Sequence, residues 1–241
     1  MRSMGVYNWR SEVHRIVRER LPSGGEVLLL SLTGSRAFGW GSDFYDIDVR
    51  GFYALEGWFD TCHLGFLMFD INLEELGHVF MSLKRRYWTI FEDTANPFYI
   101  HPDFDYEGFR KLCSADNVRH HLFSIRMEVA KFKLNPHLRS ALHAYRLVLC
   151  PLYFLKTGVI QTDVRKCNEE VFGSSILPEL CRAYATRQLG IELDVRRIQE
   201  ELDTLLHMLE EELGRRPKGE VSDEEIDRWI DSMKDMFWGD E

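Results

Sequence analysis

The stretch LTGSRAFGWGSDFYDIDVRGF, residues 32–52, decides how the rest of the chain is interpreted. It continues an apolar run, residues 26–32, that is typical of a buried strand. Its last part, from residue 46, opens a second predicted strand, residues 46–53, which alternates with a period of two. Between them lie Gly34 and Ser35, in a tight turn whose backbone N–H groups and hydroxyl suit phosphate oxygens. The sequence therefore predicts a phosphate-binding turn between two strands.

Two aspartates, Asp46 and Asp48, open the second predicted strand. Residues two apart on a strand point to the same face, so we expect the two carboxylates to converge. Their mutual repulsion would be relieved by a hard divalent cation with oxygen ligands, Mg²⁺ or Mn²⁺. An isolated Asp-x-Asp is more often a solvated strand face, and the Gly34-Ser35 turn upstream favours the metal site instead.

The same residues resemble the signature of the DNA polymerase β nucleotidyltransferase superfamily, in which Gly-Ser, a short helix and Asp-x-Asp on the next strand follow one another. The segments GSRAFG (34–39) and DIDVRG (46–51) are similar in particular to the YcgL-type predicted nucleotidyltransferases, some of whose members are linked to RNA repair. Residues 92–93 and 143–146 also have counterparts there. Tyr45 departs from the pattern, because that branch has Ser before its first aspartate.

The resemblance implies metal-dependent transfer of a nucleoside monophosphate from a nucleoside triphosphate to an acceptor. Asp46 and Asp48 would be metal ligands, and Gly34 and Ser35 would hold the triphosphate. Arg36 is either a further nucleotide contact or the partner of a nearby carboxylate. The acceptor stays open among an RNA end, a small molecule and a protein hydroxyl. The alternative is a catalytically silent nucleotide-binding or interaction module of the same fold.

The superfamily adds a third carboxylate from a later strand, and Asp70 is our choice for this catalytic residue and metal ligand. It lies in an apolar run, residues 64–71, that predicts a third strand. Glu74 is the alternative. Asn72 and Glu75 fit a capping box, so we expect Glu74 to lie at a helix start, where the helix dipole favours a negative charge.

The rest of the chain is nearly all helical in pattern, and Asn96-Pro97 interrupts it. Apolar stripes predict helices over residues 9–21, 117–134, 138–157 and around 202–213, with a last helix from Ser222. We therefore expect an α+β protein with a small mixed-sheet nucleotidyltransferase domain in residues 1–104. A helical bundle domain would follow in residues 105–241.

Several basic residues, within and outside the motif, have alternative interpretations. His143 and Arg146 lie one helical turn apart and would either line a cleft or pack inside the bundle. Arg50 is expected to form a structural salt bridge. Residues 84–86, Lys-Arg-Arg, are expected to be a solvated face rather than an RNA contact.

Composition limits the partners. The 241 residues include 30 basic and 39 acidic ones, a net charge of −9. This charge argues against broad binding along a nucleic-acid backbone, whereas a nucleotide held with a divalent cation is compatible with it. No apolar run of membrane-spanning length and no secretory signal are visible, so we expect a cytoplasmic protein without a membrane partner.

Overall fold

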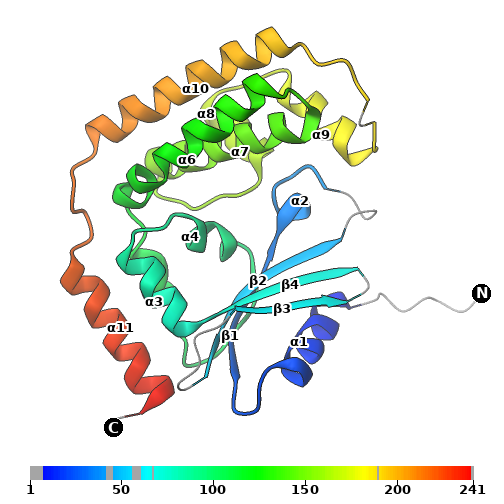
Figure 1. The fold of residues 1–241 in the computed structure, drawn as a ribbon. Helices are drawn as coiled ribbons and strands as arrows, with labels where there is room; N and C mark the ends of the chain where they lie inside the picture. The colour runs from blue at the N-terminus through cyan, green and yellow to red at the C-terminus, as the bar shows by residue number, and fades with distance from the viewer. Residues whose placement is uncertain (1–7, 42–45, 56–60, 67, 189, 240–241) are drawn as a thin grey trace, which may run out of the picture.

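The computed structural model describes residues 8–41, 46–55, 61–66, 68–188 and 190–239. Within these ranges a five-stranded mixed sheet is followed by a mainly helical region, which confirms the predicted α+β class (Figure 1). The elements in chain order are α1 (Trp9–Arg20), β1 (Glu26–Thr33), α2 (Gly34–Ala37), β2 (Ile47–Ala54), β3 (Thr61–Phe66), β4 (Phe69–Glu75), α3 (Leu76–Lys84), α4 (Thr89–Asp93), β5 (Pro97–Ile100), α5 (Tyr106–Lys111), α6 (Ala115–Leu134), α7 (Leu138–Thr157), α8 (Val164–Val171), α9 (Leu177–Ala185), α10 (Val195–Arg215) and α11 (Asp223–Trp238).

The sheet has the strand order β3-β4-β2-β1-β5, with β2 in the centre. β2 and β4 run parallel, while β1 pairs antiparallel with β2 and β5, and β3 pairs antiparallel with β4. The register places Asp48 of β2 between Thr33 of β1 and Asp70 of β4. The centre of the sheet therefore carries the motif residues.

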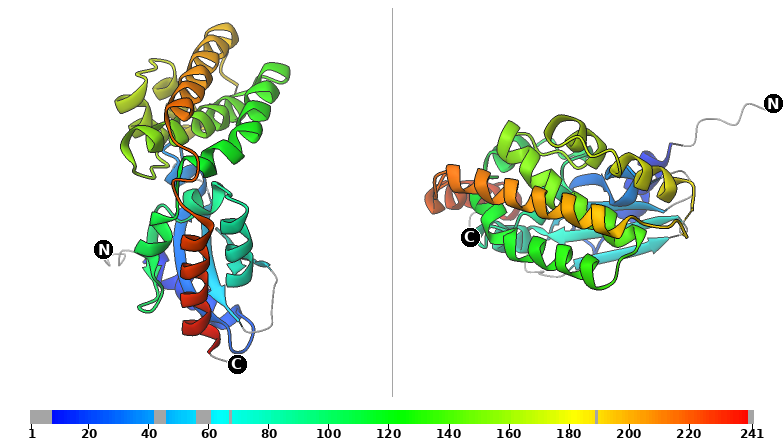
Figure 2. Two further views of the ribbon diagram at one scale, coloured as in Figure 1. Left: turned by 90° about the vertical axis from the view of Figure 1, so that its left-hand side faces the viewer. Right: turned by 90° about the horizontal axis from the view of Figure 1, so that it is seen from above.

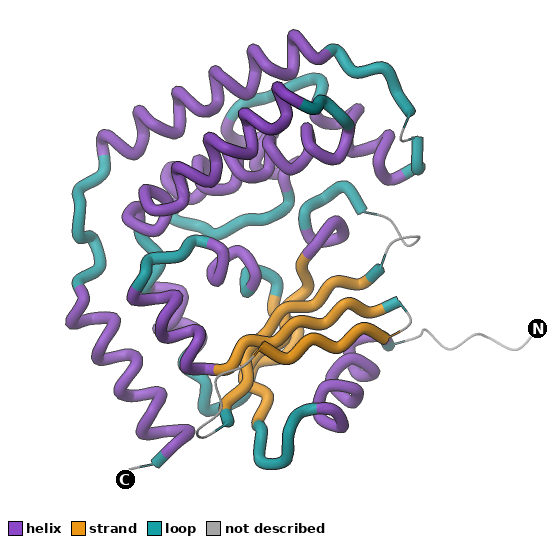
Figure 3. The backbone as a smooth tube through the Cα atoms, in the orientation of Figure 1, coloured by secondary structure: helices purple, strands orange, loops and turns teal. Residues whose placement is uncertain are grey.

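Different helices cover the two faces of the sheet (Figure 1 and Figure 3). On one face, α1 packs its apolar side against inward-facing residues such as Val49 and Ile71. The other face is covered by α3, α4, α5 and α11, which pack around Phe52. Toward the start of β2 the same face turns polar, because Asp48 and Arg50 alternate there with buried neighbours. That polar end faces the helical region.

The helical region has its own core, formed by α6 to α10. Phe38, Trp40 and Trp88 extend into this core from the first hundred residues. The chain then leaves α10 and returns along one side of the molecule, where α11 packs with the helices on the sheet (Figure 2). The proposed boundary at residue 104 stays a prediction, but α11 shares its core with the sheet.

The predicted third strand, residues 64–71, is wrong. The chain forms a hairpin of β3 and β4 with Met68 in the turn, and Leu67 lies outside the described residues. Asn72 lies inside β4 instead of capping a helix. Glu75 is the N-cap of α3, and its carboxylate accepts a hydrogen bond of 2.6 Å from the backbone N–H of Gly77.

The physical reason is the alternation along β4. Phe69, Ile71 and Leu73 are buried in the core beneath α1, and burying three large apolar side chains outweighs the weak helix-start preference of an Asn. Asp70, with Asn72 and Glu74, therefore shares the opposite face. None of the helices in the described part of the chain is long and apolar enough to cross a bilayer.

Candidate active site

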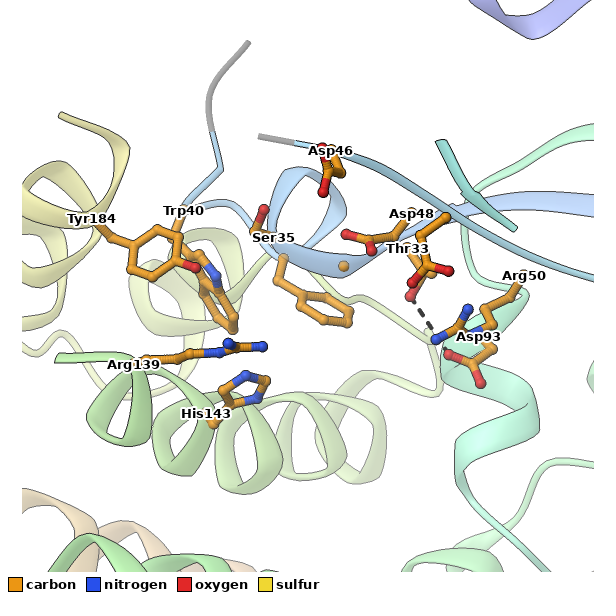
Figure 4. A pocket seen from close by; sticks show the side chains of 13 residues that line it. Thr33, Ser35, Trp40, Asp46, Asp48, Arg50, Asp93, Arg139, His143 and Tyr184 are labelled. Atoms are coloured by element: carbon orange, nitrogen blue, oxygen red, sulfur yellow. Dashed lines mark hydrogen bonds between the residues drawn. The ribbon is translucent and has the colours of Figure 1, made fainter. Parts of the chain in front are cut away.

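A cavity of about 450 Å³ lies where the polar end of the sheet meets the helical region (Figure 4). Its walls come from the β1–α2 turn, β2, β4, α4, α7 and α9. The lining residues are Thr33, Gly34, Ser35, Phe38, Trp40, Asp46, Asp48, Arg50, Asp70, Asp93, Arg139, His143 and Tyr184. Five of the predicted site residues are therefore brought together, namely Gly34, Ser35, Asp46, Asp48 and Asp70.

Gly34 is fixed by the position of Asp48. Its φ is +66°, and a Cβ placed on it would lie 1.8 Å from Asp48 Oδ2. The left-handed backbone and this close approach both require glycine. The turn therefore packs directly on the central carboxylate, with Ser35 beside it.

The segment after α2 is held in place by residues from far along the chain. The backbone N–H of Val164 donates to the Phe38 carbonyl at 3.1 Å. Thr162 bridges to Asn96, whose side-chain amide donates to its hydroxyl at 2.8 Å. A Cβ on Gly39 would lie 2.0 Å from Asp163 Oδ1. These contacts hold the segment after α2 in place as part of the cavity wall.

The three predicted carboxylates line the cavity from neighbouring positions. Asp46 is exposed and precedes β2, whereas Asp48 is half-buried on β2 with Asp70 opposite it on β4. Burial raises the pKa of Asp48, the negative charge of Asp70 raises it further, and Arg50 opposes the shift. Asp70 also lies 2.7 Å from Nε2 of His63 on β3. The site thus concentrates negative charge that lacks full compensation.

This donor set fits a divalent cation. In the described ranges no three His, Cys, Asp or Glu side chains form a ready-made metal cage. Mg²⁺, however, is usually held by one or two carboxylates together with substrate phosphates and water. Carboxylate oxygens on Asp46, Asp48 and Asp70 are ligands of the required kind. Burial first, and then the neighbouring charge of Asp70, raise the pKa of Asp48, and a bound cation would offset both effects.

The structure places the two candidates for the third carboxylate differently. Asp70 lies opposite Asp48, whereas Glu74 lies opposite Phe52, farther along β4. Of the two, only Asp70 lines the same cavity as Asp48. Glu74 lines a neighbouring cavity, with Arg50.

Sequence reasoning missed most of the wall contributed by the helices. Arg139 and His143 lie four residues apart near the start of α7, and Tyr184 comes from α9. The pKa of His143 is lowered to about 4, by burial and then by the charge of Arg146. Its ring is 5.7 Å from that of Trp40. The spacing of Arg139 and His143 on one helix face was the available signal for this wall.

Asp93, at the end of α4, is a further acidic group in the cavity. Burial raises its pKa to about 7, against the opposing charge of Arg50. The Thr33 hydroxyl is 3.5 Å from Asp93 Oδ1 (Figure 4). In the sequence, residues 92–93 are marked only by their counterpart in the resembling branch.

Two further residues singled out in the sequence, Arg146 and Arg36, do not line this cavity in the described part of the chain. Arg146 forms a 2.9 Å ion pair with Glu92, and its guanidinium lies 4.3 Å from the centre of the Phe38 ring. This arrangement agrees with the packed interpretation of Arg146. Arg36 is not among the cavity-lining residues of the described ranges, and Tyr45 lies outside them.

The basic patch at residues 84–86 pairs with α11. Lys84 lies 2.8 Å from Asp227, and Arg86 lies 2.7 Å from Asp223. These contacts join α3 to α11, so two of the three basic side chains are engaged within the protein.

A scan against models of known protein families finds no match to this chain, and a search of curated proteins finds none either.

Proposed function

We propose that this cavity is a metal-dependent nucleotidyltransferase site that moves a nucleoside monophosphate from a nucleoside triphosphate to an acceptor. One observation carries the proposal. Asp48 and Asp70 are direct neighbours across β2 and β4, and with Asp46 they line the cavity that also contains the Gly34-Ser35 turn. A strand pair that presents adjacent carboxylates beside a glycine turn suits a magnesium–triphosphate complex.

Asp46, Asp48 and Asp70 would hold Mg²⁺ or Mn²⁺. When bound, the metal neutralises phosphate charge and lowers the pKa of the attacking hydroxyl. Gly34 and Ser35 orient the triphosphate by hydrogen bonds from backbone and hydroxyl. The acceptor oxygen bonds to the α-phosphorus as the bond from that phosphorus to the bridging oxygen breaks, which releases pyrophosphate.

The helical wall would complete nucleotide binding. Arg139 projects toward the cavity from α7, and Trp40 and Tyr184 lie at the same end (Figure 4). A guanidinium suits the phosphate charge. Aromatic faces suit a stacked base without selecting its identity. The complete nucleotide site would therefore need residues from both the sheet and the helices.

The test is transfer of label from α-labelled nucleoside triphosphates, with pyrophosphate release, in Mg²⁺ or Mn²⁺ and with RNA or small-molecule acceptors. Asp48→Asn should lose nucleotide binding and transfer. Asp70→Asn should lose transfer while binding stays nearly intact, because its group acts mainly in the transition state. The exposed Asp103→Asn is the control and should behave as wild type.

Two results would count against the proposal. Metal-dependent nucleotide binding by the wild type, without pyrophosphate release under any of these conditions, would favour the catalytically silent module. No nucleotide binding with either metal would exclude both the nucleotidyltransferase and the nucleotide-binding module.

A further inference from the structure

A second cavity, of about 240 Å³, adjoins the first. Arg50 and Asp93 line both cavities, so the two meet at these side chains. The remaining lining residues of the second cavity are Gly51, Phe52, Thr61, Asn72, Glu74 and Ile90. None of these lining residues is used in the proposed nucleotide transfer.

The order of side chains along the first cavity indicates what enters from each end. In Figure 4, Trp40 and Tyr184 lie at one end, and Arg50 and Asp93 lie at the other. Asp48 lies between them. A nucleotide whose base reaches the aromatic end would therefore have its reacting phosphate near Asp48. The second cavity begins at Arg50 and Asp93, beyond Asp48, and so offers a place for an acceptor beside the reacting phosphate.

The lining of the second cavity selects for hydrogen-bond donors. Glu74 and Asp93 supply carboxylate oxygens, and Asn72 and Thr61 add neutral polar groups. Phe52, which is buried, supplies an apolar surface. Hydroxyl or amino groups would bond to the carboxylates while the C–H face of a small ring rests on the apolar surface.

The charge of this cavity disfavours an anionic acceptor. Burial raises the pKa of Glu74, and the charges of His78 and then Arg50 oppose the shift. A phosphate would meet Glu74 and Asp93 with Arg50 as the one cation among the described lining residues. An RNA end carries a phosphate on each nucleotide, so it fits this cavity poorly.

We propose that the second cavity is the acceptor subsite and that it takes a small polyhydroxy compound, neutral or cationic, such as a cyclic polyol or an amino sugar. The inference rests on the proposed function. One hydroxyl oxygen of the acceptor forms the new bond to the α-phosphorus, and pyrophosphate leaves with the electrons of the broken bond. The hydroxyl proton passes to the carboxylate of Asp93.

Asp93 is suited to accept that proton because of its position at the junction of the two cavities. Arg50 from β2, Glu74 from β4, Glu92 from α4 and Arg146 from α7 are the charged groups that act on it. With its pKa raised to about 7 by burial, its carboxylate is a stronger base than an exposed aspartate.

The subsite is tested by binding. Saturation-transfer NMR on the full chain, with Mg²⁺ and non-hydrolysable triphosphate analogues, would use myo-inositol, glucosamine, glucose 6-phosphate and a short RNA as probes. We expect inositol and glucosamine to bind and the two anionic probes to bind at least tenfold more weakly. Thr61→Trp fills the cavity and should remove binding, whereas Thr204→Trp, on exposed α10 surface, should not.

A second variant keeps the test informative if Thr61→Trp fails to fold. Glu74→Gln removes a negative charge, so glucosamine affinity should fall more than inositol affinity. The inference is overturned if neither uncharged nor cationic probes bind, or if only the anionic probes bind. Unchanged probe binding in a folded Thr61→Trp protein would overturn it as well.

The role of Asp93 has a separate readout. With an accepted probe, the wild-type transfer rate should rise with pH through about 7, because the base must lose its proton. Asp93→Asn should remove that rise and leave nucleotide affinity unchanged. The inference alone is overturned if Asp48→Asn loses nucleotide binding while Asp93→Asn and Thr61→Trp still transfer as the wild type does. Intact nucleotide binding in Asp48→Asn would overturn the proposed function.

Discussion

Gly34 shows how one residue links the backbone turn to the central carboxylate. In Gly34→Ala, the new methyl group would displace Asp48, since it would stand 1.8 Å from Oδ2. We expect magnesium-dependent nucleotide affinity to fall at least tenfold, about 1.4 kcal/mol, in calorimetry. Gly158→Ala is the matched control, because Gly158 has a φ of +74° and no atom near its Cβ position.

Gly158→Ala should therefore lose about 1 kcal/mol of stability from backbone strain while keeping its nucleotide affinity. Equal nucleotide affinity in Gly34→Ala and wild type would show that the position of Asp48 does not matter for binding.

Asp93 gives a prediction for the pH dependence of stability. Its pKa is 3.8 in the reference state and about 7 in the folded protein, so the folded state binds the proton more tightly. The contribution of proton binding at Asp93 to the free energy of unfolding is complete below pH 3.8, and it is lost as pH rises toward 7. Urea unfolding between pH 5 and 8 should therefore show a decline in wild type that is absent from Asp93→Asn. Parallel pH profiles would contradict the buried, protonated state of Asp93.

At the scale of single residues, the sequence predicted those members of the candidate site that lie close together along the chain. Gly34, Ser35, Asp46 and Asp48 all belong to one short segment, so their proximity follows from a turn and a strand. Asp93 could not be predicted, because its burial depends on helices and strands that converge only in the folded chain.

Between elements, α4 and α7 are joined by the buried ion pair of Glu92 and Arg146, which are 3% and 13% exposed. Arg146→Met should destabilise the protein by about 3–5 kcal/mol, because it leaves the Glu92 charge buried without a partner. Glu92→Leu combined with Arg146→Met should recover most of that loss. Chemical denaturation of the single and double variants measures both effects, and no recovery in the double variant would contradict this account.

The hairpin of β3 and β4 shows where element prediction failed. The apolar run through residues 64–71 reads as one strand, although the chain reverses within it. Asn72 and Glu75 mimic a helix start, whereas the alternation from Phe69 to Glu75 continues the strand. The alternation was the better signal, because burial against the rest of the core supplies more free energy than a cap.

The short helices α8 and α9 were also missed, whereas α6 and α7 were predicted close to their observed bounds and the stripe around residues 202–213 covered only part of α10. Long stripes specify a helix by themselves, whereas short helices depend on the core that they join. Tyr184 reaches the cavity from α9, so that part of the site was lost with its helix.

At the scale of the whole molecule, α11 packs against the core that covers the sheet, and Trp229 is part of that core. Its ring lies 5.6 Å from Phe109 and 6.2 Å from Phe80, and the residue is 7% exposed. Trp229→Ala should destabilise the protein by about 3–5 kcal/mol in thermal or urea unfolding. Met236→Ala, on the same helix but 53% exposed, should change stability by less than about 0.5 kcal/mol. Similar small effects in both would mean that α11 contributes little to the core.

The candidate site also depends on the whole molecule, because its walls come from both regions of the chain. The sheet supplies the carboxylates and the turn, and the helices supply Arg139, His143 and Tyr184 from the opposite wall. In the first set, Gly34, Ser35, Asp46 and Asp48 could be predicted from one stretch of sequence, and Asp70 from a second apolar run together with the resemblance. The second set depends on how α7 and α9 pack above the sheet, which no local pattern specifies.

The most direct test of the metal-dependent nucleotide site is anomalous diffraction from crystals grown with Mn²⁺ and non-hydrolysable triphosphate analogues. The account predicts a manganese peak within ligand distance of carboxylate oxygens of Asp48 and Asp70, with phosphates against Gly34 and Ser35. Manganese and nucleotide bound elsewhere on the protein, with these carboxylates bound to neither, would contradict it.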